Sequence, residues 1–267
     1  SISWTVNLKQ ELARARQHNF DSTCMIPSLY RPFTKQWLYF NRVFNERVLQ
    51  IPRIFPNAAV DNIAIMVKQR PTADSQLALM VNAPPELQTD GGAQSFPLYL
   101  YDEAAQISND DLFAEPVEGG LRRRDAITDA GLAHFQSAYP AEQVSKEDVF
   151  YYVYGILHSP DYRESFADNL SKELPRIPAV KKAADFWSFS QAGRALAHLH
   201  LNYDTVEPYA VRTDKSSGIV NDANDWAIET MGNPKYPLEL FQRVVTVSLE
   251  TQKIVKALPK LDIGTDK

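Results

Sequence analysis

Histidine and cysteine are the residue types most typical of zinc sites, and the chain has five histidines and one cysteine. His198 and His200 lie two positions apart on a predicted helix, so their side chains point to different faces. A metal pair on a helix needs a spacing of three or four, and a structural zinc site needs more thiols than Cys24 offers. We therefore expect ordinary core or surface histidines and no metal site.

Motifs of nucleotide, phosphate and ester chemistry are missing from the sequence. There is no G-x-x-x-x-G-K-[ST] loop, no G-x-G-x-x-G turn and no G-x-S-x-G elbow. Carboxylates are plentiful, but no spacing singles out an acid and base pair, and Cys24 has no local signature of a nucleophile. These observations favour a binding module without catalytic residues, with an unrecognised hydrolase as an alternative.

The basic residues are unevenly distributed, although the net charge is −5. Residues 1–70 contain ten Lys and Arg against four acids, whereas residues 71–120 contain nine acids and no Lys or Arg. Neutralisation of nucleic-acid phosphates is local, so the first segment can supply it within an acidic chain. A solvated surface with chance clustering explains the same pattern.

The helices and strands expected from the sequence indicate an α+β fold. Residues 1–140 are expected to form a mixed lobe with a small sheet, and residues 141–267 a mainly helical lobe packed against it. Short apolar runs predict strands at 36–40, 62–68, 76–81 and 96–101. Helical spacing and caps predict helices at 3–17, capped by Ser3, and at 147–158, 159–174, 185–200 and 237–258.

Location and membrane contact are constrained by what the sequence lacks. No apolar run approaches the ~18 residues that a membrane span needs. No secretion signal is visible, and a single cysteine fits a reducing compartment. We expect a cytoplasmic protein that does not contact a membrane.

Several phrases are more specific than composition, and they follow one another over nearly the whole chain. They are residues 28–36 (SLYRPFTKQ) with 38–40 (LYF), 96–101 (FPLYLY), 149–163 (VFYYVYGILHSPDYR) running on to 169–178 (NLSKELPRIP), 199–203 (LHLNY), 214–222 (DKSSGIVND) and 245–251 (VTVSLET). Together they resemble the C-terminal target-recognition region of Type ISP restriction-modification enzymes. One minor departure is Ala223, where the family's pattern suggests proline.

This resemblance implies that the chain is a non-catalytic part of a bacterial enzyme. In that family, nuclease, helicase-like ATPase, coupler, adenine methyltransferase and target-recognition parts share one polypeptide. The target-recognition part would select a short asymmetric double-stranded DNA sequence for methylation and cleavage. S-adenosylmethionine, ATP and magnesium would act elsewhere in the parent chain, whose methyltransferase and ATPase domains would be partners. The alternative is a docking module of the same enzyme that never reads bases.

Candidate DNA contacts in the first half are cationic or amide side chains near strand ends. Arg31 offers a planar fork beside a rigid proline, although an ion pair in the core explains it as well. Backbone contacts are expected from Lys35, Arg42, Lys68 and Arg70. Base contacts are expected from Gln69, Arg70 and Gln76, because Arg suits guanine and Gln suits adenine.

Two further segments are candidates in the remainder of the chain. Arg122, Arg123 and Arg124 are expected either to clamp phosphates or to form a solvated loop. Lys215 and Ser217 belong to a loop that a glycine would let approach a phosphate closely. The same loop is equally explained as a tight turn held by neighbouring aspartates.

Overall fold

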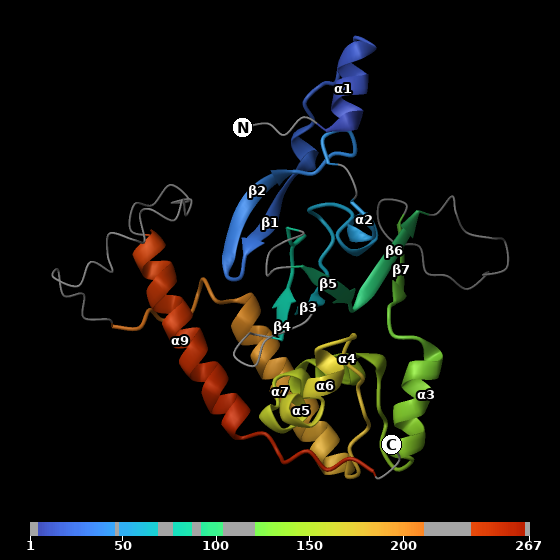
Figure 1. Ribbon diagram of the computed structural model, residues 1–267, viewed down its shortest axis with the longest axis vertical. Coiled ribbons are helices and arrows are strands. Elements are labelled where there is room, and N and C mark those ends of the chain that lie inside the picture. The colour runs from blue at the N-terminus through green and yellow to red at the C-terminus, as the bar shows by residue number, and fades with distance from the viewer. Residues whose placement is uncertain are drawn as a thin grey trace.

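Strands gather in the upper half of the computed structural model, above a group of helices (Figure 1). The structure describes residues 5–45, 48–68, 77–86, 92–103, 121–210 and 236–264. Its elements, in chain order, are α1 (Val6–Ala13), a 3-10 turn η1 (Ser22–Cys24), β1 (Met25–Arg31), β2 (Thr34–Tyr39), α2 (Ile51–Ile54), β3 (Ala64–Lys68), β4 (Ala78–Val81), β5 (Ala93–Pro97), β6 (Tyr99–Glu103), β7 (Leu121–Asp125), α3 (Asp129–Ala138), α4 (Lys146–Leu157), α5 (Pro160–Ser165), α6 (Ala167–Leu170), α7 (Ala183–Leu201) and α9 (Tyr236–Lys256). The predicted α+β class is confirmed.

The described strands form three small antiparallel sheets. β1 pairs with β2, β6 pairs with β7, and β3 lies between β4 and β5. β4 is buried along its whole length and β3 up to Lys68, which explains their continuous apolar runs. The strand expected at 96–101 is divided into two, because the chain bends at Leu98, whose N–H donates to the carbonyl of Ile63. The chain there forms the end of β5 and the start of β6.

The helical lobe is built on the crossing of α4 and α7. A capping box between Ser145 and Asp148 begins α4. As predicted, Ser159 caps α5 with Pro160 at its first position. The helix expected at 159–174 is shorter than predicted. It is interrupted at Phe166, whose backbone leaves the helical region with φ −108° and ψ 15°, and α6 then ends at Leu170.

One core joins the sheet β4-β3-β5 to the helices. Ile65 and Met80 from the strands belong to the same buried cluster as Tyr152 and Leu196 from α4 and α7. The backbone N–H of Met80 also donates a hydrogen bond of 2.8 Å to the hydroxyl of Tyr154. The two sides of the boundary predicted at residue 140 therefore share one hydrophobic core.

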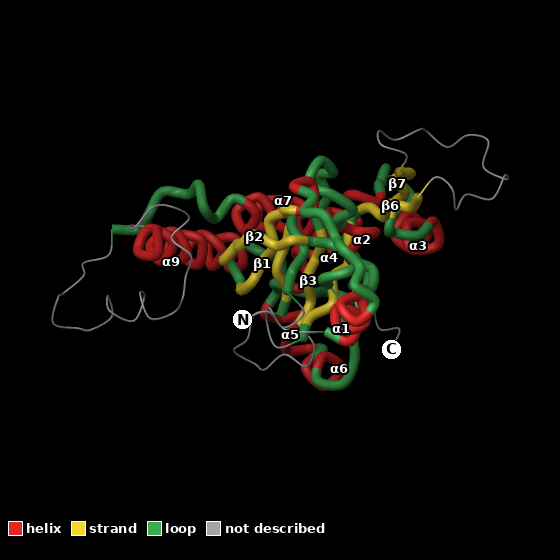
Figure 2. The backbone as a smooth tube through the Cα atoms, turned by 90° about the horizontal axis from the view of Figure 1, so that it is seen from above, coloured by secondary structure: helices red, strands yellow, loops and turns green. Residues whose placement is uncertain are grey.

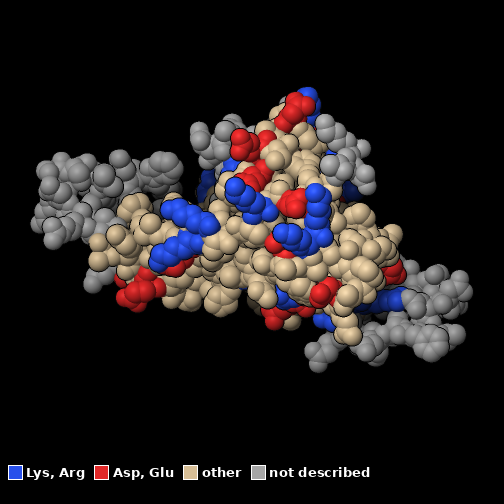
Figure 3. Space-filling model, turned by 90° about the horizontal axis from the view of Figure 1, so that it is seen from below, with Lys and Arg blue, Asp and Glu red and all other residues tan. Residues whose placement is uncertain are grey.

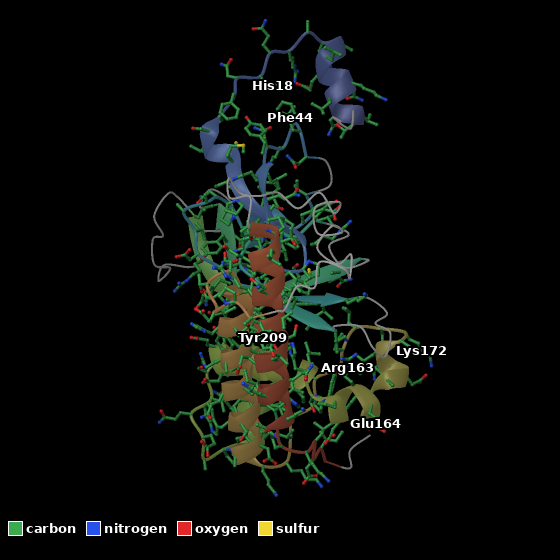
Figure 4. The ribbon with its side chains drawn as sticks, turned by 90° about the vertical axis from the view of Figure 1, so that its left-hand side faces the viewer. His18, Phe44, Arg163, Glu164, Lys172 and Tyr209 are labelled. Atoms are coloured by element: carbon green, nitrogen blue, oxygen red, sulfur yellow. The ribbon has the colours of Figure 1, made fainter. Side chains whose placement is uncertain are left out.

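The N-terminal helix and the longest helix extend from this core in different directions. α1 projects at the top of Figure 1, and α9 runs along one side next to α7 (Figures 1 and 2). Thr5 caps α1 at its described end, whereas the predicted cap Ser3 lies outside the described residues. The rings of His18 and Phe44 lie 6.4 Å apart and join the segments that follow α1 and β2 (Figure 4). Within the described ranges, no helix combines the length and apolar character that crossing a bilayer requires.

Candidate nucleic-acid interface

Arg31 lies at the end of β1, beside the tip of the β1–β2 hairpin. Its guanidinium carbon is 4.5 Å from the centre of the Tyr30 ring, and one terminal nitrogen is 3.8 Å from the carboxylate of Glu86. Both members of this ion pair are about half exposed, with 51% and 44% of their side chains accessible. An exposed pair of this kind contributes little to stability, and it leaves the guanidinium accessible to a ligand.

Lys35 lies on the other strand of the hairpin, near the helical lobe. Its ammonium is 5.5 Å from the centre of the Tyr203 ring. Phe33, at the tip, has a left-handed backbone with φ 58° and packs edge-on against Tyr203 at 5.3 Å and against His200 at 6.0 Å. The aromatic contacts therefore fix the hairpin tip on the end of α7, and Lys35 with it.

Arg122, Arg123 and Arg124 belong to β7, so the alternative of a solvated loop is wrong. In the β6–β7 ribbon, Arg122 faces Asp102 across the strands, and Arg124 faces Leu100. Side chains alternate along a strand, so Arg122 and Arg124 lie on one face and Arg123 on the other. The guanidinium of Arg123 lies over the ring of Tyr99, with its carbon 4.4 Å from the ring centre. The ribbon, on the right of Figure 1, thus carries arginines on both of its faces.

Asp102 joins two arginines from different elements. Arg53 of α2 donates from Nε to its Oδ1 at 2.8 Å, and Nη2 of Arg53 lies 2.6 Å from the same oxygen in an ion pair. Arg124 donates to its Oδ2 from Nε at 2.8 Å. Arg53 also donates from Nη1 to Gln50 at 3.0 Å. This network, which we call the Asp102 clamp, fixes α2 against the ribbon and keeps a net positive charge.

The carboxylate of Asp102 is ionised at neutral pH. Partial burial would raise its pKa, but the hydrogen bonds and charges of Arg124 and Arg53 outweigh burial and hold the pKa below its ordinary value. The clamp is therefore a stable ionic arrangement over the physiological pH range.

The remaining predicted contacts lie apart from the clamp or outside the described residues. Arg42 is exposed in the turn after β2, and Lys68 is half-buried at the end of β3. Gln69, Arg70, Gln76, Lys215 and Ser217 lie outside the described residues.

Carboxylates accompany many described cations of the first 70 residues. Glu11 of α1 lies 3.2 Å from Arg16, which follows the helix; in the same way Asp102 lies beside Arg53, and Glu86 beside Arg31. On the lower face of the molecule, basic and acidic side chains are interspersed without a patch of one sign (Figure 3). Arg16, Arg31 and Arg53 thus each lie next to a carboxylate, and they do not form one positive surface.

The described residues show no arrangement suited to metal-dependent chemistry. Among them, no three His, Cys, Asp or Glu side chains come close enough to hold a metal ion. His200 is buried, with its ring nitrogens hydrogen-bonded to Tyr154 at 2.5 Å and Thr251 at 2.8 Å. These contacts give His200 a structural role in the core.

Arg53, Asp102 and Tyr99 are candidate-site residues that the sequence analysis missed. The aromatic and apolar run that ends at Tyr101 is a strand signal, so Asp102 directly after it is expected beside whichever strand pairs with this run. The partner strand comes from residues 121–125, and no local sequence pattern specifies that pairing.

Comparisons with known proteins agree with the family suggested by the sequence. A family model described as the Type ISP C-terminal specificity domain matches residues 1–212. No curated protein matches the chain.

Solved structures of longer enzymes contain a region with the same fold. The ATP-dependent Type ISP restriction-modification enzyme LlaBIII bound to DNA is 25% identical, with a TM-score of 0.76 over 98% of this chain and 20% of that one. A DrdV–DNA complex is 25% identical, with a TM-score of 0.75 over 97% of this chain and 31% of its own. A nuclease-deletion mutant of the Type ISP enzyme LlaGI with a DNA substrate mimic is 26% identical, with a TM-score of 0.71 over 98% and 23%. The chain thus spans a third or less of these relatives.

Proposed function

Because the chain belongs to the Type ISP C-terminal specificity domain family, we propose that it recognises a specific double-stranded DNA sequence for a longer restriction-modification enzyme. The observation that carries this proposal is the family match over residues 1–212. Three structural relatives, each similar over at least 97% of this chain, are complexes with DNA or with a DNA substrate mimic. A specificity domain is a recognition part and not a catalytic one.

The β6–β7 ribbon is the described element best suited to contact the duplex. A two-stranded ribbon is narrow enough to enter the major groove of B-form DNA. Arg122 and Arg124 lie on one of its faces and Arg123 on the other. Arginine suits both phosphates and guanine edges because its guanidinium donates two parallel hydrogen bonds. Arg31 and Lys35 on the hairpin are proposed as further phosphate contacts.

The chemistry of the parent enzyme is proposed to take place in its other parts. The chain covers only 20–31% of the length of two of its relatives, which leaves room for several further domains. Adenine methylation would use S-adenosylmethionine there, and DNA cleavage would use ATP and magnesium. A bacterial cytoplasmic location fits an enzyme that acts on DNA.

An exchange of whole domains tests the proposed function. This chain would replace the corresponding domain of a family member with a different target, and methylated sites would be mapped in the resulting enzyme. We expect the methylated sequence to follow the exchanged domain. If the chimera methylates the target of the recipient, the domain is a docking module and does not read bases. A second chimera that exchanges residues 60–130 alone would test whether that segment holds the base-reading residues.

A further inference from the structure

The two arginines of the Asp102 clamp differ in how many of their guanidinium nitrogens contact other residues of the protein. Arg53 commits all three of its guanidinium nitrogens inside the protein, two to Asp102 and one to Gln50. Arg124 commits only Nε, and among the described residues its two terminal nitrogens have no hydrogen-bond partner. Its side chain is 48% exposed, whereas that of Asp102 is 26% exposed. Arg124 is therefore the member of the clamp that can still bind a ligand.

We infer that Asp102 is a positioning residue for DNA recognition, which holds Arg124 so that its two terminal nitrogens meet a pair of acceptor atoms on the duplex. The inference rests on the proposed function and adds a residue to it. A free arginine side chain loses rotamer entropy when it is held in one geometry on binding. A hydrogen bond at Nε removes much of that freedom in advance and leaves the outer edge of the guanidinium available for two parallel hydrogen bonds.

The negative charge of an acidic residue in a DNA-binding surface repels phosphates, so the presence of Asp102 in this surface has to be explained. In the clamp, one carboxylate lies between two guanidinium groups, so the three side chains together keep one positive charge. Without the carboxylate, Arg53 and Arg124 would repel each other and Arg124 would lose its anchor on the ribbon. Positioning therefore offsets the unfavourable charge of Asp102.

Two kinds of acceptor pair on DNA match this geometry, namely two oxygens of one phosphate or O6 and N7 of one guanine. They differ in what they contribute to binding. A phosphate contact adds about one unit to the slope of log K against log salt and no sequence preference. A guanine contact adds discrimination at one base pair and leaves the salt slope unchanged.

The test measures the affinity of the parent enzyme for its target duplex and for single base-pair variants at several salt concentrations. The variants are Asp102→Asn, Arg124→Ala and the two combined. Asp168→Asn is the matched control, because it also removes one negative charge. Asp168 lies on α6 and forms an exposed ion pair of 2.7 Å with Lys172, which is labelled in Figure 4. α6 and the β6–β7 ribbon lie well apart in both Figures 1 and 2.

We expect Asp102→Asn to weaken target binding about tenfold, and Asp168→Asn to change it by less than about twofold. In the Arg124→Ala background, Asp102→Asn should add no further loss, because the two residues act through one contact. A reduced salt slope identifies a phosphate as the partner, and reduced discrimination at one position identifies a guanine.

Two results would overturn the inference. One is an Asp102→Asn enzyme that binds its target as tightly as the wild type or more tightly, as simple charge repulsion predicts. The other is an equal loss with and without Arg124, which is what a general folding defect would produce. A chimera that keeps the recipient's target in the domain-exchange experiment would instead refute the proposed function.

Discussion

His200 and Tyr154 share a buried hydrogen bond whose direction follows from their neighbours. The hydroxyl of Tyr154 accepts from the backbone N–H of Met80 at 2.8 Å, so its own proton is donated to Nδ1 of His200. Nε2 of His200 must then carry the ring proton, which it donates to Thr251 at 2.8 Å. His200 is therefore neutral, and it links α7 to α4 and α9 through the core.

His158 is a second neutral imidazole next to His200. Its Nδ1 lies 2.8 Å from the backbone carbonyl of Tyr154, an acceptor, so Nδ1 carries the proton. Nε2 is buried and has no hydrogen-bond partner among the described residues. The two rings lie 5.5 Å apart, so a proton on one disfavours a proton on the other.

The buried histidines predict a loss of stability in mild acid. Burial lowers the pKa of His158 to about 4, and burial together with the charge of His158 lowers the pKa of His200 to about 3. The unfolded chain takes up both protons near the ordinary pKa of 6.5 and so binds more protons than the folded protein below that pH. The free energy of unfolding should fall by roughly 2 kcal/mol for each histidine between pH 7 and pH 5. Urea unfolding at several pH values measures this slope.

Replacing one histidine isolates its share of that effect. His158→Gln should remove about half of the pH dependence between pH 7 and pH 5, whereas His134→Gln, which removes an exposed imidazole, should leave it intact. A free energy of unfolding that stays constant over this range would show that the buried rings are not held neutral.

At the scale of elements, local signals predicted the helices better than the strands. The apolar spacing of residues 147–158 and the Ser159-Pro160 pair are local signals of helices, and α4 and α5 lie there in the structure. β7 was not expected as a strand, because its sequence LRRRD lacks an apolar pattern and depends on pairing with β6. β1 was missed as well, and its Pro27 makes it unlike a regular strand in sequence.

The crossing of α4 and α7 depends on two glycines that face each other's helix. A Cβ added at Gly155 would overlap the backbone carbonyl of Phe189, and one added at Gly193 would overlap the carbonyl of Tyr151. Because the obstacle is backbone, the helices would have to move apart. Gly155→Ala or Gly193→Ala should therefore lower the free energy of unfolding by about 3 kcal/mol or more, despite the better helix propensity of alanine.

Gly131 in α3 provides the matched control for this prediction. A Cβ there would lie 3.4 Å from Oγ1 of Thr128, which is an ordinary contact. Gly131→Ala should be neutral or stabilise the protein by up to about 1 kcal/mol. Chemical denaturation compares the three variants. Equal effects at Gly131 and Gly155 would mean that the close approach of α4 and α7 does not limit the side chain.

At the scale of the whole molecule, the sequence predicted the family and fold class but not the arrangement of the candidate site. The positive charge of the first 70 residues was visible in the sequence, but the carboxylates that accompany it are not all nearby in the chain. Arg53 and Asp102 are separated by 49 positions, and Arg124 reaches Asp102 from another strand. Contacts of this kind are set by the pairing of strands and the packing of α2, which no local pattern encodes.

The shared core predicts that the two lobes unfold together. Ile65 of β3 and Leu196 of α7 belong to the same buried cluster, and Met80 is hydrogen-bonded to α4 through Tyr154. Leu196→Ala, which leaves a cavity on the helical side, should cost about 2–5 kcal/mol. Hydrogen exchange should show the same loss of protection in β3 as in α7, because both exchange through one global unfolding event. If the amides of β3 kept their wild-type protection while those of α7 lost it, the lobes would be independent folding units, and the core would not couple the ribbon and sheet to the helices.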